Sequence, residues 1–117
     1  MLNISNISVV ETLRKFKKVD LSVCFLVPTE TGLNKSIMDA TKSLREYFSK
    51  YEIHDFEKQP KGMQSKVLLS TILISGNAII ETKTSLYRPE TKNGDPRIWI
   101  YKLGDYAQAG DLISFSS

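Results

Sequence analysis

A chain of 117 residues with 41% hydrophobic content has room for one domain with an ordinary core, and no second domain fits. Its single cysteine excludes an internal disulfide, and no apolar run approaches the roughly 20 residues of a membrane-spanning helix. The formal net charge of +3 is a weak basic bias, which is compatible with a polyanion partner without identifying one.

The first structural signal is a short helix over residues 8–18. Ser8 and Glu11 have the spacing of a capping box, and Val9, Leu13 and Phe16 then recur at helical intervals. The segment ends in the basic run RKFKK, and cations in a last helical turn interact favourably with the helix dipole.

A buried strand is predicted next, at residues 21–28. The apolar run LSVCFLVP is closed by Pro28 and contains Cys24, which we expect to be a buried thiol in a reducing compartment. The N-terminus lacks a basic region followed by a long apolar stretch. The sequence therefore predicts a soluble, cytoplasmic protein with no membrane partner.

A longer helix is predicted over residues 34–50, after a turn formed by TETG. Asn34 would cap this helix. Its apolar positions fall on one stripe that would cover a sheet: Ile37, Ala40, Leu44, Phe48 and Tyr51.

Period-two patterns in the second half of the chain predict β-hairpins. The runs SKVLLSTILI and AIIETKTSLY flank Gly76-Asn77, a pair that supplies the positive φ angles of a tight turn. The sequence KNGD signals a second hairpin that leads into PRIWIYKL, and AGDLISF supplies a last short strand. Two helices and five or six mostly antiparallel strands make a single α+β domain over residues 1–117, built as a mostly antiparallel sheet or a partly open β-barrel.

Metal-dependent catalysis is one functional alternative. The chain has one His and one Cys without paired ligand spacing, so a zinc site finds no support. His54 is expected to orient a loop, to satisfy a backbone carbonyl or to act as an acid or base. Glu81 and Lys83 share a strand face, and with Asp55 they could form a Mg²⁺-dependent nuclease site. The favoured alternative is a non-catalytic domain that needs no cofactor.

The segment SLYRPETKNGDPRIWIY favours double-stranded DNA as the partner. A two-stranded ribbon fits the major groove and reads bases through Arg, Lys, Asn and Gln on its turns and strand ends. The predicted base-reading residues, Arg88, Asn93 and Arg97, lie around the KNGD turn. Lysines would neutralise phosphates without reading the sequence, and the predicted phosphate contacts are Lys35, Lys83, Lys92 and Lys102.

Three aromatic residues flank the same turn. Tyr87 precedes it, and Trp99 and Tyr101 follow it. Their rings would pack in the core or stack on a sugar or a displaced base.

Three stretches of the sequence resemble the N-terminal region of restriction endonucleases of the MvaI/BcnI type: VPTETGLNKSIMDATKSLREYF, IHDFEKQPKG and ETKTSLYRPETKNGDPRIWIYKLGDYAQAGDLI. The similarity covers roughly residues 25–113. In that family the nuclease domain lies downstream, so the resemblance implies an accessory DNA-binding domain at the N-terminal part of a longer restriction enzyme. Such a domain is similar in purpose to the effector domain of EcoRII-type enzymes, whose pseudobarrel fold is shared with plant transcription factors.

Three functions remain open on the sequence alone. The first is a non-catalytic DNA-binding domain of a restriction system. The second is a small metal-dependent nuclease that uses Asp55, Glu81 and Lys83. The third is a protein-interaction module, such as a phage-encoded inhibitor, because a weak net charge is not diagnostic of DNA binding.

Overall fold

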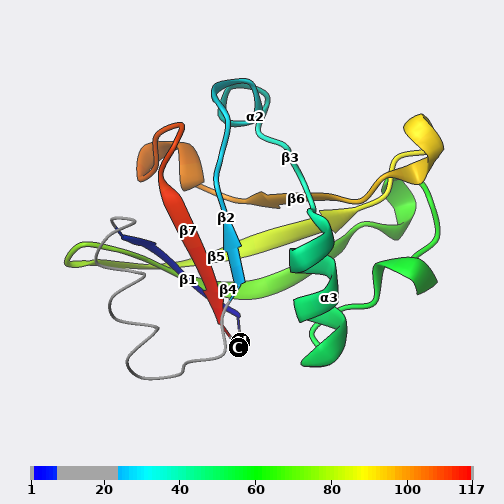
Figure 1. The fold of residues 1–117 in the computed structure, drawn as a ribbon, viewed down its shortest axis with the longest axis horizontal. Coiled ribbons are helices and arrows are strands. Elements are labelled where there is room, and N and C mark those ends of the chain that lie inside the picture. Colours follow the sequence, from blue (N-terminus) through cyan, green and yellow to red (C-terminus); the bar gives the residue numbers. More distant parts are fainter. Residues whose placement is uncertain (1, 8–23, 117) are drawn as a thin grey trace.

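The computed structural model describes residues 2–7 and 24–116, and one seven-stranded sheet forms the centre of this part of the chain (Figure 1). The strands are β1 (Leu2–Ile7), β2 (Cys24–Leu26), β3 (Met38–Asp39), β4 (Val67–Ser75), β5 (Ala78–Tyr87), β6 (Arg97–Ile100) and β7 (Leu112–Ser116). Their order across the sheet is β2-β7-β1-β4-β5-β6-β3. The β1–β4 pair is parallel and the other pairs are antiparallel.

The sheet is not closed into a barrel. Strands β2 and β3 are its two edges, and no pairing joins them within the described residues. The α+β class and the mostly antiparallel sheet are therefore confirmed.

The hairpin of β4 and β5 forms where the alternating pattern predicts it. Leu73 pairs with Ile80 and Ser75 pairs with Ala78, so only Gly76 and Asn77 lie in the turn. Gly76 has a φ of 58°, whereas Asn77 is not among the residues with positive φ. One positive φ at the first central position is typical of a type II′ turn, in which glycine is favoured.

The predicted helix over 34–50 is wrong in its first half. The described residues contain two α-helices instead, α2 (Glu30–Lys35) and α3 (Lys42–Lys50), separated by the edge strand β3. Ser36 ends α2 with a left-handed φ of 55°. Thr29, not Asn34, caps α2 and accepts a hydrogen bond from Gly32 at 2.9 Å, while Thr41 caps α3. The apolar residues keep a helical spacing across this break, so the sequence pattern does not indicate where it lies.

The predicted helix over 8–18 lies outside the described residues, as do residues 21–23 of the predicted strand over 21–28. The described part of that strand is β2, and its Cys24 is 7% exposed. Burial disfavours the thiolate and raises the pKa of Cys24 to about 12.

The chain between β5 and β6 is a nine-residue connection rather than a tight hairpin at KNGD. The two strands do pair antiparallel, with Leu86 opposite Ile98. The first three residues of KNGD form a 3₁₀ turn, η3 (Lys92–Gly94), and Asp95 follows it. Three further 3₁₀ turns in the described chain are η1 (Phe56–Lys58), η2 (Met63–Ser65) and η4 (Leu103–Asp105).

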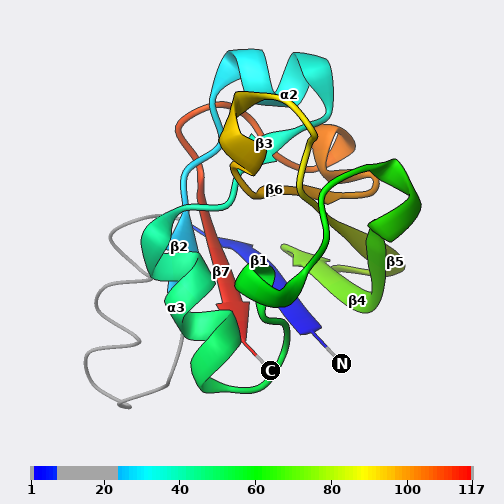
Figure 2. The same ribbon diagram turned by 90° about the vertical axis from the view of Figure 1, so that its right-hand side faces the viewer.

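The core lies between α3 and the inner face of the curved sheet (Figure 2). Phe48 of α3 contacts Phe115 of β7 edge-on at 6.0 Å between ring centroids and stacks on Phe56 at 6.4 Å. Alternate residues of β6 point into this core, so Ile98 and Ile100 are at most 1% exposed. No helix within the described residues is long and apolar enough to cross a membrane.

Candidate nucleic-acid interface

Arg88 lies directly after β5 and holds three segments of the chain together. Its Nε donates to the carbonyl of Gly94 at 2.8 Å, and its Nη1 donates to the carbonyls of Phe56 at 3.3 Å and Gln59 at 3.2 Å. Its own carbonyl accepts a hydrogen bond from the amide of Gly62 at 2.7 Å. The guanidinium predicted to read bases is therefore bound to the protein's own backbone.

Gln59 extends this network beneath the loop. Its side chain is 6% exposed, and its Nε2 donates to the carbonyls of Ser65 at 3.0 Å and Leu86 at 2.9 Å. Because Nε2 is the donor group, Oε1 must accept the 2.9 Å hydrogen bond from Nε2 of His54. His54 also packs edge-on against Phe56, so its observed contacts are those of a loop-orienting residue.

Arg88 holds the turn formed by residues 91–95, which we call the tip. The tip is the yellow coil at the right-hand end of Figure 1. Lys92, Asn93 and Gly94 have consecutive positive φ angles of 51°, 59° and 70°. Lys92 and Asn93 are exposed, whereas Gly94 is buried. A Cβ at Gly94 would overlap the aliphatic chain of Lys61, which therefore packs over the tip. Sequence reasoning missed Lys61, because no local pattern links it to a turn thirty residues later.

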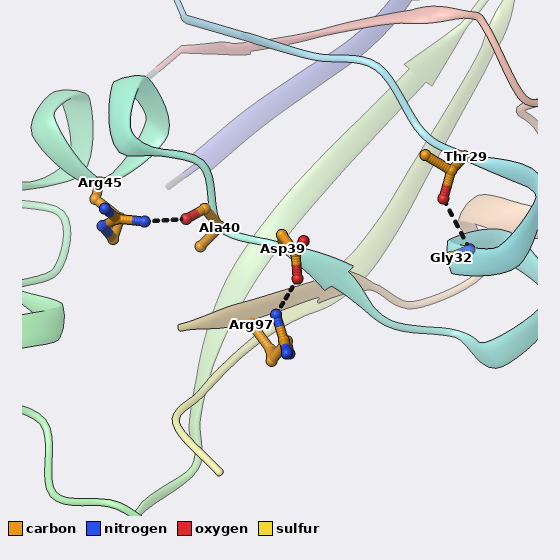
Figure 3. Close-up of polar contacts among 6 residues, drawn as sticks. All are labelled: Thr29, Gly32, Asp39, Ala40, Arg45 and Arg97. Atoms are coloured by element: carbon orange, nitrogen blue, oxygen red, sulfur yellow. Dashed lines mark hydrogen bonds and ion pairs between the residues drawn. The ribbon is translucent and has the colours of Figure 1, made fainter. Parts of the chain in front are cut away.

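Arg97 also has an internal partner. Its Nη1 forms an ion pair with Oδ1 of Asp39, across the β3–β6 pair (Figure 3). The Arg97 side chain is 15% exposed and that of Asp39 is 79% exposed. In the same view, Arg45 of α3 donates to the carbonyl of Ala40 at 2.6 Å. Base reading by Arg97 would thus compete with the Asp39 carboxylate.

The three other predicted phosphate contacts lie away from the tip. Lys35 is in the last turn of α2, and Lys83 faces outward in the middle of β5. Lys102 precedes η4, the orange turn at the opposite end of β6 from the tip in Figure 1. All three are exposed, and each lies in or next to an element other than that of the tip.

A groove of about 720 Å³ runs between α3, η1 and the β3–β6 edge. Its lining carries three basic and three acidic side chains: Lys42, Arg45, Arg88, Asp39, Glu57 and Asp95. Opposite charges in equal number give this groove no strong preference for an anion.

The residues of the nuclease alternative lie on separate surfaces. Asp55 lines a hollow beside α3, and its Oδ1 accepts from the amide of Glu57 at 3.0 Å. Glu81 and Lys83 line a different hollow, over β4 and β5. Within the described residues, no three His, Cys, Asp or Glu side chains come together in a way that could hold a metal ion.

Comparisons with protein-family models, with curated proteins and with solved structures gave no match to this chain. The functional assignment therefore depends on the site geometry and on the sequence pattern.

Proposed function

We propose that this protein is a non-catalytic, double-stranded DNA-binding domain that contacts DNA through the tip. The supporting observation is the tip itself. Two polar side chains, Lys92 and Asn93, are presented outward from a turn that Arg88 holds from within and that the exposed Lys61 packs against. A fixed turn loses little conformational entropy on binding, which is the advantage of preorganisation.

Each side chain of the tip has a distinct role in this proposal. Lys92 and Lys61 contact phosphates, which positions the tip on the duplex without reading sequence. The Asn93 amide carries both a donor and an acceptor and can pair with an adenine edge in the major groove. Arg88 keeps the tip in shape instead of reading a base.

Two carboxylates limit the affinity that this tip can supply. Glu90 and Asp95 are exposed beside Lys92, so the local charge is nearly balanced. The proposal therefore expects weak, salt-sensitive binding, with non-specific Kd values of about 10⁻⁴ to 10⁻⁶ M at physiological salt. Sequence preference would come from Asn93.

The wider setting is also part of the proposal. The resemblance to MvaI/BcnI-type enzymes supports a restriction system, in which a downstream nuclease domain would cut the DNA. A pseudobarrel relationship is compatible with the strongly curved open sheet and the short helices at its sides (Figure 2).

Fluorescence anisotropy of labelled duplexes at about 50 and 200 mM salt tests the tip. Lys92→Ala should lower the salt slope by about one unit. Asn93→Ala should reduce discrimination between sequences by about 1–3 kcal/mol. Lys102→Ala, which removes an exposed lysine at the other end of β6, should change neither quantity.

Two outcomes would contradict the proposal. Equal losses in Lys92→Ala and Lys102→Ala would remove the tip from the interface, and no duplex binding at low salt would remove DNA as the partner. Incubating the protein with plasmid and Mg²⁺ is the parallel control, because a non-catalytic domain leaves the plasmid intact.

A protein-interaction module is the second candidate, and one observation favours it. On the outer face of the β4–β5 hairpin, Leu68 is 47% exposed and Ile79 is 73% exposed, with Ile74 paired opposite Ile79. Exposed apolar strips of this kind often mark protein contacts. In that case a protein partner would lose affinity in Ile79→Ser, while duplex DNA would not bind.

A further inference from the structure

A hollow of about 240 Å³ opens on the outer face of β5 and β6. Three of its walls are aromatic, from Tyr87, Trp99 and Tyr101, and Met63 of η2 and Ile37 extend them. This aromatic pocket is on the surface, because Met63 is 59% exposed and Tyr101 is 37% exposed.

Strand alternation explains why these rings face outward together. Ser85 pairs with Trp99, and Tyr87 pairs with Arg97, so the four side chains project from one face of the β5–β6 ladder. Their neighbour Leu86 is fully buried in the core on the other face.

Four polar side chains that line the pocket have no hydrogen-bond partner in the described part of the chain. No hydrogen bond within residues 2–7 and 24–116 involves the side chains of Ser85, Tyr87, Trp99 or Lys66. Tyrosine hydroxyls and tryptophan indoles at partly buried positions ordinarily find a partner. These donors and acceptors are therefore open to a ligand in the pocket.

Charge and size narrow the class of ligand. The lining includes two cations, Lys66 and Arg97, and no carboxylate. Aromatic cages often bind ammonium groups, but the two cations here would repel such a ligand. The pocket therefore favours a ring that is attached to an anionic group. Arg97 uses Nη1 for Asp39, but a guanidinium has five N–H donors, so others are left for a phosphate. A pocket smaller than the roughly 300 Å³ of a drug-sized site suits a single flat ring system.

We infer that the aromatic pocket binds one unstacked nucleobase, with its phosphate directed toward Lys66 and Arg97. Aromatic stacking supplies affinity for any base, and extrusion from a duplex is least costly at an unpaired position. This inference deepens the proposed function. The tip would hold the duplex. The pocket, whose Arg97 follows the tip by two residues, would receive the displaced base.

The single tryptophan of the chain, Trp99, makes the pocket directly observable. The protein is titrated with a duplex carrying one bulged adenine, with the same duplex carrying an abasic site at that position, and with dAMP. The bulged-adenine duplex should quench Trp99 emission and bind about tenfold more tightly than the abasic duplex. The abasic duplex should bind without quenching.

Variants of two lining residues test the assignment further. Tyr87→Ser should abolish the tenfold preference, while Tyr87→Phe, which keeps the ring, should retain most of it. Lys66→Ala should weaken binding of the bulged duplex without unfolding the protein. Val27→Ser, a change of an exposed apolar side chain outside the pocket, is the matched control and should leave quenching unchanged.

The outcomes separate the pocket from the tip. Binding of both duplexes with equal affinity and no quenching overturns the pocket and leaves the DNA-binding function intact. Quenching by dAMP without binding of either duplex overturns the DNA-binding function and identifies a free nucleotide as the source of the base. No quenching by any of the three ligands overturns the pocket.

Discussion

At the residue scale, Arg88 differs from the exposed Lys92 of the same segment, because its guanidinium donates to backbone carbonyls inside the protein. Its guanidinium reaches the carbonyls of Phe56 and Gln59, which are 32 and 29 residues away in the chain. Residue type and position gave no indication of this role, because the local sequence around an arginine next to a turn is the same whether the arginine binds within the protein or faces outward toward DNA. Lys92 and Asn93 have exposed side chains and remain the proposed contacts with DNA.

Replacing Arg88 separates a folding role from a binding role. Arg88→Ala removes the donor to three backbone carbonyls, and hydrogen bonds to a charged group each contribute about 1.5–3 kcal/mol. The two bonds from Nη1 are long, at 3.3 and 3.2 Å, and the side chain is only half-buried, so water can replace part of what is lost. We therefore expect the free energy of unfolding to fall by about 2–3 kcal/mol and not by the full sum, measured as a lower urea midpoint at constant slope. Lys92→Ala should change it by less than about 0.5 kcal/mol, since that side chain is exposed. Equal midpoints in the two variants would contradict the role of Arg88.

At the element scale, the hairpin and the helix show different degrees of predictability. The β4–β5 hairpin followed from alternation and from Gly76, both of which are local properties. The break between α2 and α3 could not be predicted in this way, because the apolar residues Ile37 and Ala40 continue a helical spacing. In the structure Ile37 directly precedes strand β3 and Ala40 directly follows it. Two threonine caps, Thr29 and Thr41, are the local signals that could have located it.

The turn residue Gly76 provides a test of the hairpin. Gly76→Ala places a Cβ in open space but at a φ of 58°, so only backbone strain opposes it. We expect a loss of about 1–2 kcal/mol, seen as a lower midpoint of thermal unfolding. Gly104→Ala is the matched control, because its Cβ also meets no atom within 4 Å and its φ is not positive. A similar effect of both substitutions would show that strain at Gly76 is not the cause.

At the scale of the whole molecule, β1 joins the two halves of the sheet. It pairs in parallel with β4 and antiparallel with β7, so strands from the middle and the end of the chain meet on it. Ile4 in β1 is fully buried. The described strands should therefore unfold as one cooperative unit.

Truncation of Ile4 tests this central position. Ile4→Ala should lower the free energy of unfolding by about 2–5 kcal/mol, with circular dichroism and Trp99 fluorescence following one transition in urea. Ile79→Ala removes the same atoms from a side chain that is 73% exposed and should cost less than about 0.5 kcal/mol. Two separate transitions would contradict a single unit organised around β1.

The sequence alone determined that the strands β4, β5 and β6 alternate their side chains between two faces, and where the β4–β5 turn lies, because strand period and turn chemistry are set by neighbouring residues. Only the tertiary structure decided that Arg88 and Arg97 bind within the protein, and that Lys61 supports the tip. It also decided that Tyr87 and Trp99 share a pocket. These are pairings between segments far apart in the chain, fixed by the register of the sheet, and no local pattern encodes them.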